Sequence, residues 1–444
     1  MKKSLIPACA LLLMVVSAMA GDAKPASVES AVERAATGFV SLLIRGDFQK
    51  ATAQFDETML GALPPAKLED VWKSELETWG DYQKIEATRM LPYQGYRIVF
   101  VTCLFKNQSV DVKVVYDQKD RIAGLFFVPP QSGEPRTPVY AKENLFHDRE
   151  VTFGVEGWIL PGTLSMPVGK GPFPVLILVH GSGPNDQDES IGPNKPFRDL
   201  AWGLASQGIA VLRYEKRTHK YAARIMEIKD LTVKEETITD ALEAVSFMRK
   251  TEGVDAGRVF VLGHSLGGML APRIAAGNTA IAGLVILAGP ARPLEDLILE
   301  QTLYQASLSG ELSPEDQKKV EDIKRTVAAV KKLSKESPAA GLLLGAPASY
   351  WLDLRDYKPV LAAKTLKQPM LILQGEKDCQ VRMDDFTQWR NALSSRTDVL
   401  MKSYPALNHL FMEVPGRSTG AEYQQPDNVA VAVVNDIADW IRKH

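Results

Sequence analysis

The sequence predicts two domains: a small α+β domain, followed by a larger α/β domain built on a mostly parallel sheet. The chain has 444 residues, which is long for a single domain. In its second part, short apolar runs alternate with helical stretches such as residues 234–249. Continuous apolar runs are typical of parallel strands that are buried on both faces. These runs cover residues 175–179, 209–214, 259–262, 284–287, 370–373 and 399–404.

The first residues have the pattern of an export signal. Lys2 and Lys3 precede an apolar run over residues 5–18, which ends in the tripeptide AMA at residues 18–20. A basic start, a short apolar run and an A-x-A site predict a signal peptide over residues 1–20, and hence a periplasmic or secreted protein. The alternative is a membrane anchor, but a span needs about 20 apolar residues. We therefore expect that the protein is not an integral membrane protein.

Charge and cysteine content argue against several classes of function. The formal net charge is -2, whereas nucleic-acid-binding domains carry a basic face. Beyond the signal, Cys103 and Cys379 fall in different predicted domains, so they do not form a disulfide framework. No Cys/His cluster has the spacing of a zinc site. We expect no nucleic-acid partner, no metal and no cofactor.

Residues 27–128 are predicted to form the small α+β domain. Residues 28–44 and 65–78 have helical periodicity. β-rich runs then follow at residues 96–105, 109–116 and 121–128. Helices followed by an antiparallel meander are typical of this fold class. Residues 129–140 begin with a run rich in Pro, Gly and polar residues and predict a linker.

The second domain, residues 141–444, is predicted to contain a hairpin and a helical insertion. Residues 151–155 and 158–166 have the pattern of two paired strands. Residues 292–368 are mostly helical and interrupt the alternation of strands and helices, which predicts a cap beside the sheet. Apolar residues within this cap, at 342–344 and 350–351, could line an acyl pocket. Such residues more often make the contact between a cap and its sheet.

Residues 263–267 (GHSLG) match the G-x-S-x-G pattern of a nucleophile elbow. The pattern alone is weak, but an apolar strand directly precedes it and a helical stretch over residues 268–276 directly follows. A nucleophilic serine on a strained turn between strand and helix needs small residues two positions to either side. Ser265 is therefore the predicted nucleophile. An incidental serine in an ordinary strand–helix turn is the alternative.

A serine hydroxyl needs a base, and the base needs a carboxylate to orient it. Of the six histidines, His409 follows the last predicted strand, from where a loop can reach back over the nucleophile. Asp378 follows an apolar strand and a tight Gly turn, and it precedes His409. The order Ser, Asp, His is that of α/β hydrolases. The competing carboxylates are Glu376 and Asp384.

The oxyanion of a tetrahedral intermediate needs backbone donors. The N–H of Leu266 is one candidate, because it follows the nucleophile at the start of a helix. The loop after the apolar run at 175–179 reads HGSGP, and we expect the second donor to be Ser182. No G-K-[ST] follows this Gly-rich loop, so it does not match a phosphate loop.

Several segments together carry a family resemblance. They are HGSGP at residues 180–184 with Asp186 and Asp188, GHSLGG at 263–268, YWLDL at 350–354 and QGEKD at 374–378. Through them, the C-terminal two thirds resembles bacterial carboxylesterases of the α/β-hydrolase fold, which implies a mostly parallel central sheet with a helical cap. The N-terminal part is similar to a domain of unknown function that often precedes such hydrolases, through Phe48, residues 55–56, residues 63–64 and Trp72.

The resemblance implies a serine carboxylesterase acting on short-chain esters, with a small-molecule substrate. Some relatives are dienelactone hydrolases, but those use Cys where this chain has Ser265. An exported serine peptidase of the aminopeptidase type is the alternative, with Asp186, Asp188 and Glu189 holding the substrate amine. A degenerate hydrolase with a binding role is a third hypothesis. The N-terminal domain shows no catalytic pattern, so we expect it to capture substrate or to form a homo-oligomer.

Overall fold

The computed structural model describes residues 31–93, 96–128, 135–225, 227–308, 314–334 and 341–444, together with a few single positions between these ranges. The predicted signal peptide and part of the predicted linker lie outside the described residues. The chain divides between residues 133 and 134 into two compact units. Each unit is described by itself.

The N-terminal unit is a four-stranded antiparallel sheet with helices packed on one face. The strands are adjacent in the order of the sequence, as a meander requires. The elements are α1 (Ala31–Ile44), α2 (Phe48–Thr52), α3 (Glu57–Ala62), α4 (Pro65–Trp79), β1 (Tyr82–Tyr93), β2 (Tyr96–Phe105), β3 (Ser109–Tyr116) and β4 (Ile122–Val128). The α+β prediction is confirmed. Strand β1 was not predicted, because its polar sequence is that of an edge strand with little apolar alternation.

The C-terminal unit is built on an eight-stranded sheet with the order β12-β11-β10-β9-β7-β8-β6-β5. Strands β7 to β12 are parallel to their neighbours within that group, whereas β5 and β6 join the edge in antiparallel pairs. The bounds are β5 (Phe146–Phe153), β6 (Leu160–Pro167), β7 (Phe173–Val179), β8 (Ala210–Tyr214), β9 (Val254–His264), β10 (Ile281–Leu287), β11 (Met370–Gly375) and β12 (Val399–Tyr404). The predicted mostly parallel sheet is confirmed.

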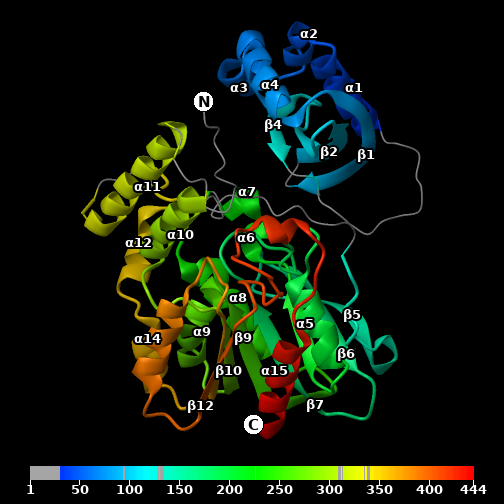
Figure 1. Ribbon diagram of the computed structural model, residues 1–444. Coiled ribbons are helices and arrows are strands. Elements are labelled where there is room, and N and C mark those ends of the chain that lie inside the picture. The colour runs from blue at the N-terminus through cyan, green and yellow to red at the C-terminus, as the bar shows by residue number, and fades with distance from the viewer. Residues whose placement is uncertain are drawn as a thin grey trace. The chain divides into compact units, whose positions relative to one another are not determined.

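Helices cover both faces of this sheet (Figure 1). One face packs on α5 (Pro196–Ala205) and α15 (Val431–Lys443) through an apolar cluster that includes Phe197 and Trp440. The other face packs on α8 (Thr239–Met248), α9 (Leu266–Ala276) and α14 (Met383–Leu393). Because the central strands are buried on both sides, their sequences are continuously apolar. The short helical segments are α6 (Arg217–Lys220), α7 (Ala222–Ile225), a π-helical turn (Lys234–Ile238) and two 3₁₀ turns (Glu143–Leu145 and Ala421–Gln424).

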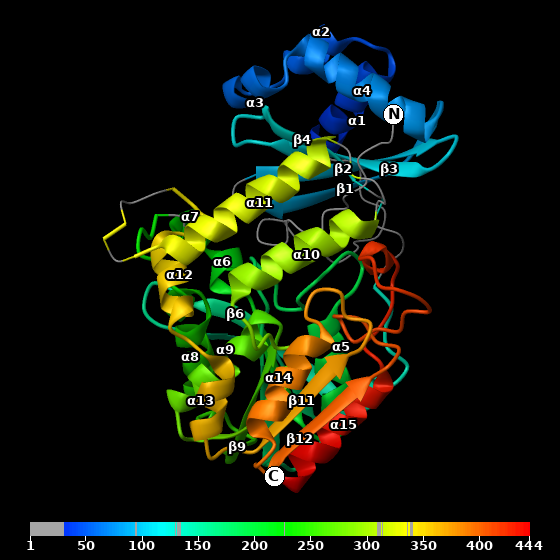
Figure 2. The same cartoon turned by 60° about the vertical axis from the view of Figure 1, so that its left-hand side comes forward.

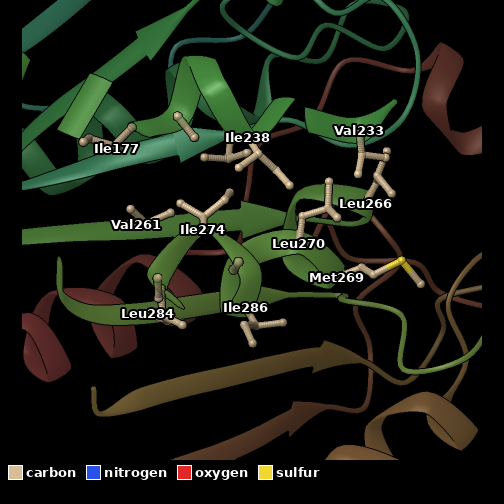
Figure 3. Close-up of a cluster of buried hydrophobic side chains, with 14 of the residues drawn as sticks. Ile177, Val233, Ile238, Val261, Leu266, Met269, Leu270, Ile274, Leu284 and Ile286 are labelled. Carbon is tan, nitrogen blue, oxygen red and sulfur yellow. The ribbon is translucent and has the colours of Figure 1, made fainter. Parts of the chain in front are cut away.

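Helix α9 is held firmly in the larger apolar cluster (Figure 3). Its side chains Leu266, Leu270 and Ile274 are fully buried against β9 and β10. The cluster also takes in Val233 and Ile238, from the segment around the π-helical turn. Ser265, which directly precedes α9, is therefore attached to a firmly packed helix.

The stretch between β10 and β11 is helical, as predicted, and carries α10 (Leu294–Leu308), α11 (Pro314–Lys332), α12 (Ala348–Arg355) and α13 (Pro359–Thr365). Helices α10 and α11 lie side by side (Figure 2). Helix α13 instead packs on α9 and α14 and continues the layer that covers the sheet. None of the described helices is long and apolar enough to cross a membrane.

Candidate active site

Ser265 stands on a strained turn between β9 and α9. Its backbone has φ 52° and ψ -120°, a conformation that residues other than glycine rarely adopt. A Cβ atom at Gly263 would lie 2.1 Å from the carbonyl oxygen of Gly267, and one at Gly267 would lie 2.3 Å from that of Val179. Glycine is therefore required at both positions. The turn has the geometry of a nucleophile elbow.

His409 and Asp378 form a buried pair. The two atoms Nδ1 of His409 and Oδ2 of Asp378 are 2.7 Å apart, and both side chains are almost fully buried. The other oxygen of Asp378 accepts the backbone N–H groups of Gln380 and Val381, at 2.7 and 2.9 Å. Gln374 donates to Oδ2 at 3.1 Å. With Nδ1 bound to a carboxylate, Nε2 of His409 is left as the basic nitrogen.

A second acid–histidine pair fastens His409 to the elbow. His264 directly precedes the nucleophile, and its Nε2 donates to the backbone carbonyl of His409 at 2.9 Å. The centroids of the His264 and His409 rings are 4.7 Å apart. On the other side, Nδ1 of His264 lies 2.8 Å from Oε2 of Glu189. The loop that carries the base is thus tied to the turn that carries Ser265.

The partners of His264 favour its doubly protonated, charged form. Burial alone would lower its pKa, but the Glu189 carboxylate, the His409 carbonyl and the Asp378 charge together raise the pKa above its ordinary value. Burial would raise the pKa of Glu189, but His264 lowers it below its usual range. A carbonyl oxygen can only accept, so Nε2 of His264 carries one proton, and Nδ1 carries the other toward the carboxylate. The two side chains form a buried ion pair.

Glu189 also organises the predicted oxyanion loop. Its second oxygen accepts the N–H of Gly181 at 2.6 Å. A Cβ atom at Gly181 would lie 3.1 Å from that of Ser265, so the loop touches the nucleophile. Because the Gly181 N–H already donates to Glu189, the next backbone donor along the loop is the N–H of Ser182. The structure brings Ser182, Ser265 and Leu266 together in the wall of one cavity.

This cavity has a volume of about 30 Å³ and a partly apolar lining. Helix α10 supplies much of its wall. The lining residues are Ser182, Ser265, Leu266, Pro290, Leu294, Leu297, Ile298, Gln301, Gln380 and Val381. Tyr350 and Trp351, considered from the sequence as acyl-pocket residues, are buried in the core instead. No motif pointed to the α10 side chains, since an apolar helical face has the same pattern whether it lines a pocket or packs on a core.

The carboxylates proposed for holding a substrate amine all have partners within the protein. Asp188 pairs with Arg213 and, at 3.1 Å, with Lys195. Asp186 accepts Ser190 Oγ at 2.7 Å and backbone N–H groups, and burial raises its pKa to about 6. Glu189 is paired with His264.

The competing triad candidates lie in other surroundings. Glu376 is exposed and accepts Ser403 Oγ at 2.7 Å, and Asp384 is exposed at the start of α14. His180 is buried and its Nε2 lies 2.9 Å from the carbonyl of Asp186, and burial lowers its pKa to about 4. His219 pairs with Glu215. In the part of the chain that the structure describes, no group of three His, Cys, Asp or Glu side chains could hold a metal ion.

Comparisons with known proteins found one curated relative that covers most of the chain and several solved structures that cover part of it. Over 417 residues, covering 94% of this chain and 97% of the relative, the chain is 38% identical to esterase EstD of Thermotoga maritima. A solved esterase of Pyrococcus furiosus has a TM-score of 0.44 and 16% identity, covering 70% of this chain and 97% of its own. Dipeptidyl peptidase 4 of Porphyromonas gingivalis has a TM-score of 0.45 and 15% identity, with coverages of 80% and 43%.

Two family matches divide the chain in the same way as the structure. Residues 36–125 match a family described as a protein of unknown function, DUF3887. Residues 175–414 match the family described as serine aminopeptidase, S33. The chain therefore belongs to the S33 family of α/β hydrolases, carries a DUF3887 domain ahead of the hydrolase domain, and is a relative of esterase EstD.

Proposed function

We propose that the protein is a serine carboxylesterase that hydrolyses short-chain carboxylic esters through an acyl-enzyme. One observation carries the proposal. The buried His409–Asp378 pair is tied through His264 to the turn that carries Ser265, and Ser265 shares a cavity with Ser182 and Leu266. A nucleophile, an oriented base and two backbone donors are the parts that acyl transfer needs.

The geometry supports the following reaction. Ser265 Oγ attacks the ester carbonyl while Nε2 of His409 accepts its proton, and Asp378 stabilises the imidazolium that forms. The N–H groups of Ser182 and Leu266 bind the oxyanion, and the alcohol leaves with the proton from His409. Water then attacks the acyl-enzyme with His409 as base, which releases the acid and restores Ser265.

The preference for short acyl chains is proposed from the cavity. Its volume is about 30 Å³, and Leu294, Leu297 and Ile298 of α10 form its apolar wall. A small cavity walled by these side chains favours a short acyl chain over a long one such as octanoyl.

The alternative is a serine peptidase of the aminopeptidase type, which the description of the matching family favours. An aminopeptidase needs a carboxylate free to bind the substrate amine. The three acidic residues beside the oxyanion loop are all engaged with Arg213, Lys195, Ser190 or His264. We therefore prefer the carboxylesterase hypothesis, and the name of the relative, esterase EstD, agrees with it.

We also propose that the protein is exported, because residues 1–20 have the pattern of a cleaved signal. The N-terminal domain is proposed to capture substrate or to associate with a second copy. Expression of the full chain, followed by sequencing of the mature N-terminus and by light scattering, would test both. A mature chain that begins at Met1 would contradict export.

The activity is tested with acetyl, butyryl and octanoyl nitrophenyl esters and with aminoacyl nitroanilides, using the mature protein and Ser265→Ala. The expected result is ester turnover that falls with chain length and is lost in the variant. Nitroanilide turnover lost in the same variant would assign a peptidase instead. Ester hydrolysis that survives Ser265→Ala would refute the serine mechanism.

A further inference from the structure

A buried lysine binds the loop that is expected to hold the oxyanion. Lys216 lies between β8 and α6, and only 2% of it is exposed. Its Nζ donates to the carbonyl oxygen of Gly181 at 2.7 Å. Leaving a lysine ammonium in the interior is costly unless it is paired and hydrogen-bonded, so a buried lysine at this place calls for an explanation.

The carbonyl that Lys216 binds belongs to the same peptide unit as the N–H of Ser182. In a trans peptide, the C=O and N–H bonds lie in one plane and point in opposite directions. Because the oxygen is held by Lys216, the N–H of Ser182 is fixed toward the opposite side. A cation on the carbonyl oxygen also polarises the peptide and makes its N–H a stronger donor.

The counter-ion of Lys216 comes from a rare type of helix. Oε1 of Glu236 accepts Nζ of Lys216 at 2.6 Å, and Oε2 accepts the hydroxyl of Tyr350 at 2.6 Å. Glu236 lies in the π-helical turn Lys234–Ile238. Such turns occur frequently at functional sites, since the extra residue redirects a side chain. Burial raises the pKa of Tyr350 well above its ordinary value, so its hydroxyl stays protonated and donates.

The same loop carbonyl has a second, weaker partner. Nδ2 of Asn185 lies 3.2 Å from the Gly181 oxygen, 3.1 Å from that of Ser182 and 3.3 Å from that of Gly183. The backbone N–H of Lys216 donates in turn to the carbonyl of Asn185 at 3.1 Å. Asn185 therefore fixes the loop as a whole, whereas Lys216 places a charge on one peptide.

We propose that Lys216 is a positioning residue of the oxyanion hole, which orients and polarises the Gly181–Ser182 peptide and is itself held by Glu236 and Tyr350. The inference rests on the proposed serine mechanism. It assigns a role in the transition state to a residue that does not touch the substrate. It also connects α12, which carries Tyr350, to the reacting centre.

The test compares Lys216→Met with Arg217→Met as a matched control. Arg217 is the next residue and is also buried, but its guanidinium donates to Asp240 rather than to the oxyanion loop. Both variants lose a buried cation, so both should lose thermal stability. Removing one oxyanion donor outright costs on the order of 100- to 1000-fold in kcat. We expect Lys216→Met to lower kcat for nitrophenyl acetate by roughly 10- to 100-fold with KM changed less than about 3-fold, since the donor is misplaced rather than lost.

The second readout is the affinity for phenylboronic acid, whose tetrahedral serine adduct places an oxygen in the oxyanion hole. This affinity should fall in Lys216→Met by a factor similar to the fall in kcat, and it should stay near the wild-type value in Arg217→Met. A folded Lys216→Met with wild-type kcat would overturn the proposal. Equal losses of kcat in the two variants would overturn it as well, because they would indicate a general structural effect.

If Lys216→Met does not fold, Tyr350→Phe decides the question. It removes one hydroxyl from Glu236 and should lower kcat by roughly 2- to 5-fold at constant KM, because each oxyanion contact acts mainly in the transition state. Tyr140→Phe, which removes a hydroxyl donor to the Val429 carbonyl, is its control and should keep the wild-type kcat. An unchanged kcat in Tyr350→Phe would then refute the proposal. Activity retained in Ser265→Ala would instead refute the underlying mechanism.

Discussion

Replacing Glu189 by alanine tests whether the second acid–histidine pair supports the site. The carboxylate is 3% exposed and accepts two hydrogen bonds, one from the Gly181 N–H and one from His264. Alanine removes both acceptors and leaves the His264 imidazolium without a counter-ion. Because burial lowers the pKa of His264, the ring should become neutral in this variant rather than stay charged.

The expected cost can be worked from these contacts. An orphaned, buried Gly181 N–H costs about 1–3 kcal/mol. The one methylene group that is lost contributes about 0.8 kcal/mol. The sum is about 3 kcal/mol in the free energy of unfolding, which for a domain of this size lowers the melting temperature by roughly 6 °C.

Glu189→Gln is the matched control. The glutamine oxygen can accept the Gly181 N–H, and its amide can donate to Nδ1 of a neutral His264 that keeps its proton on Nε2. Both variants keep a Cβ atom at this position, where φ is 51°, so backbone strain is unchanged. We expect Glu189→Gln to melt within about 2 °C of the wild type at pH 8, since its net loss is below about 1 kcal/mol.

The assay is thermal unfolding followed by circular dichroism and by residual ester hydrolysis, with all three proteins in the same buffer. A Glu189→Ala variant that melts at the wild-type temperature would contradict a supporting role for Glu189. Equal destabilisation of the Gln and Ala variants would contradict it as well, because the hydrogen bonds of this side chain would then be irrelevant.

Three further predictions follow from the site. Asp378→Asn should keep the fold but lower kcat by about 10³- to 10⁴-fold, because the amide favours the wrong tautomer of His409; a loss below 10-fold would exclude this role. Raising the pH should reduce the stability advantage of the wild type over Glu189→Gln. Because the pKa of His264 is raised, its contribution to the free energy of unfolding is complete below about pH 6.5 and is lost as the pH rises through the raised value. Because the pKa of Glu189 is lowered, its contribution to the free energy of unfolding is complete above about pH 4.5. Melting curves from pH 5 to 9 would check this, and a constant difference would contradict it. Gly267→Ala should prevent folding, since its Cβ would meet a carbonyl oxygen at 2.3 Å. Gly38→Ala in α1, where a Cβ atom meets open space, should instead stabilise the protein by about 0.5–1 kcal/mol. Soluble expression and the melting temperature distinguish the two outcomes.

Local patterns were sufficient for most of the fold. The buried strands, among them β7 and β11, appear in the sequence as apolar runs, because a parallel strand covered on both faces has no polar side. The polar edge strand β1 escaped prediction for the converse reason. The π-helical turn before α8 was included in one predicted helix, since the two helical periods are too similar to separate over five residues.

The elbow could be predicted from the sequence because the residues it requires are close together in the chain. Ser265 needs glycine at two nearby positions, and those three residues lie within one short motif. Asp378 and His409 were chosen by their order and by their places after strands. The contact between them joins two loops that are 31 residues apart in the chain.

The sequence by itself determined the sheet, the position of the elbow and the order of the candidate triad, because each depends on neighbouring residues and on periodicity. Only the tertiary structure decided what surrounds them. It pairs Glu189 with His264, bonds Lys216 to a carbonyl of the oxyanion loop and places α10 in the cavity wall. These side chains come from distant segments, and a charged residue in a loop has the same local pattern whether it is solvated or buried. Their roles arise from burial and partner choice, which packing alone establishes.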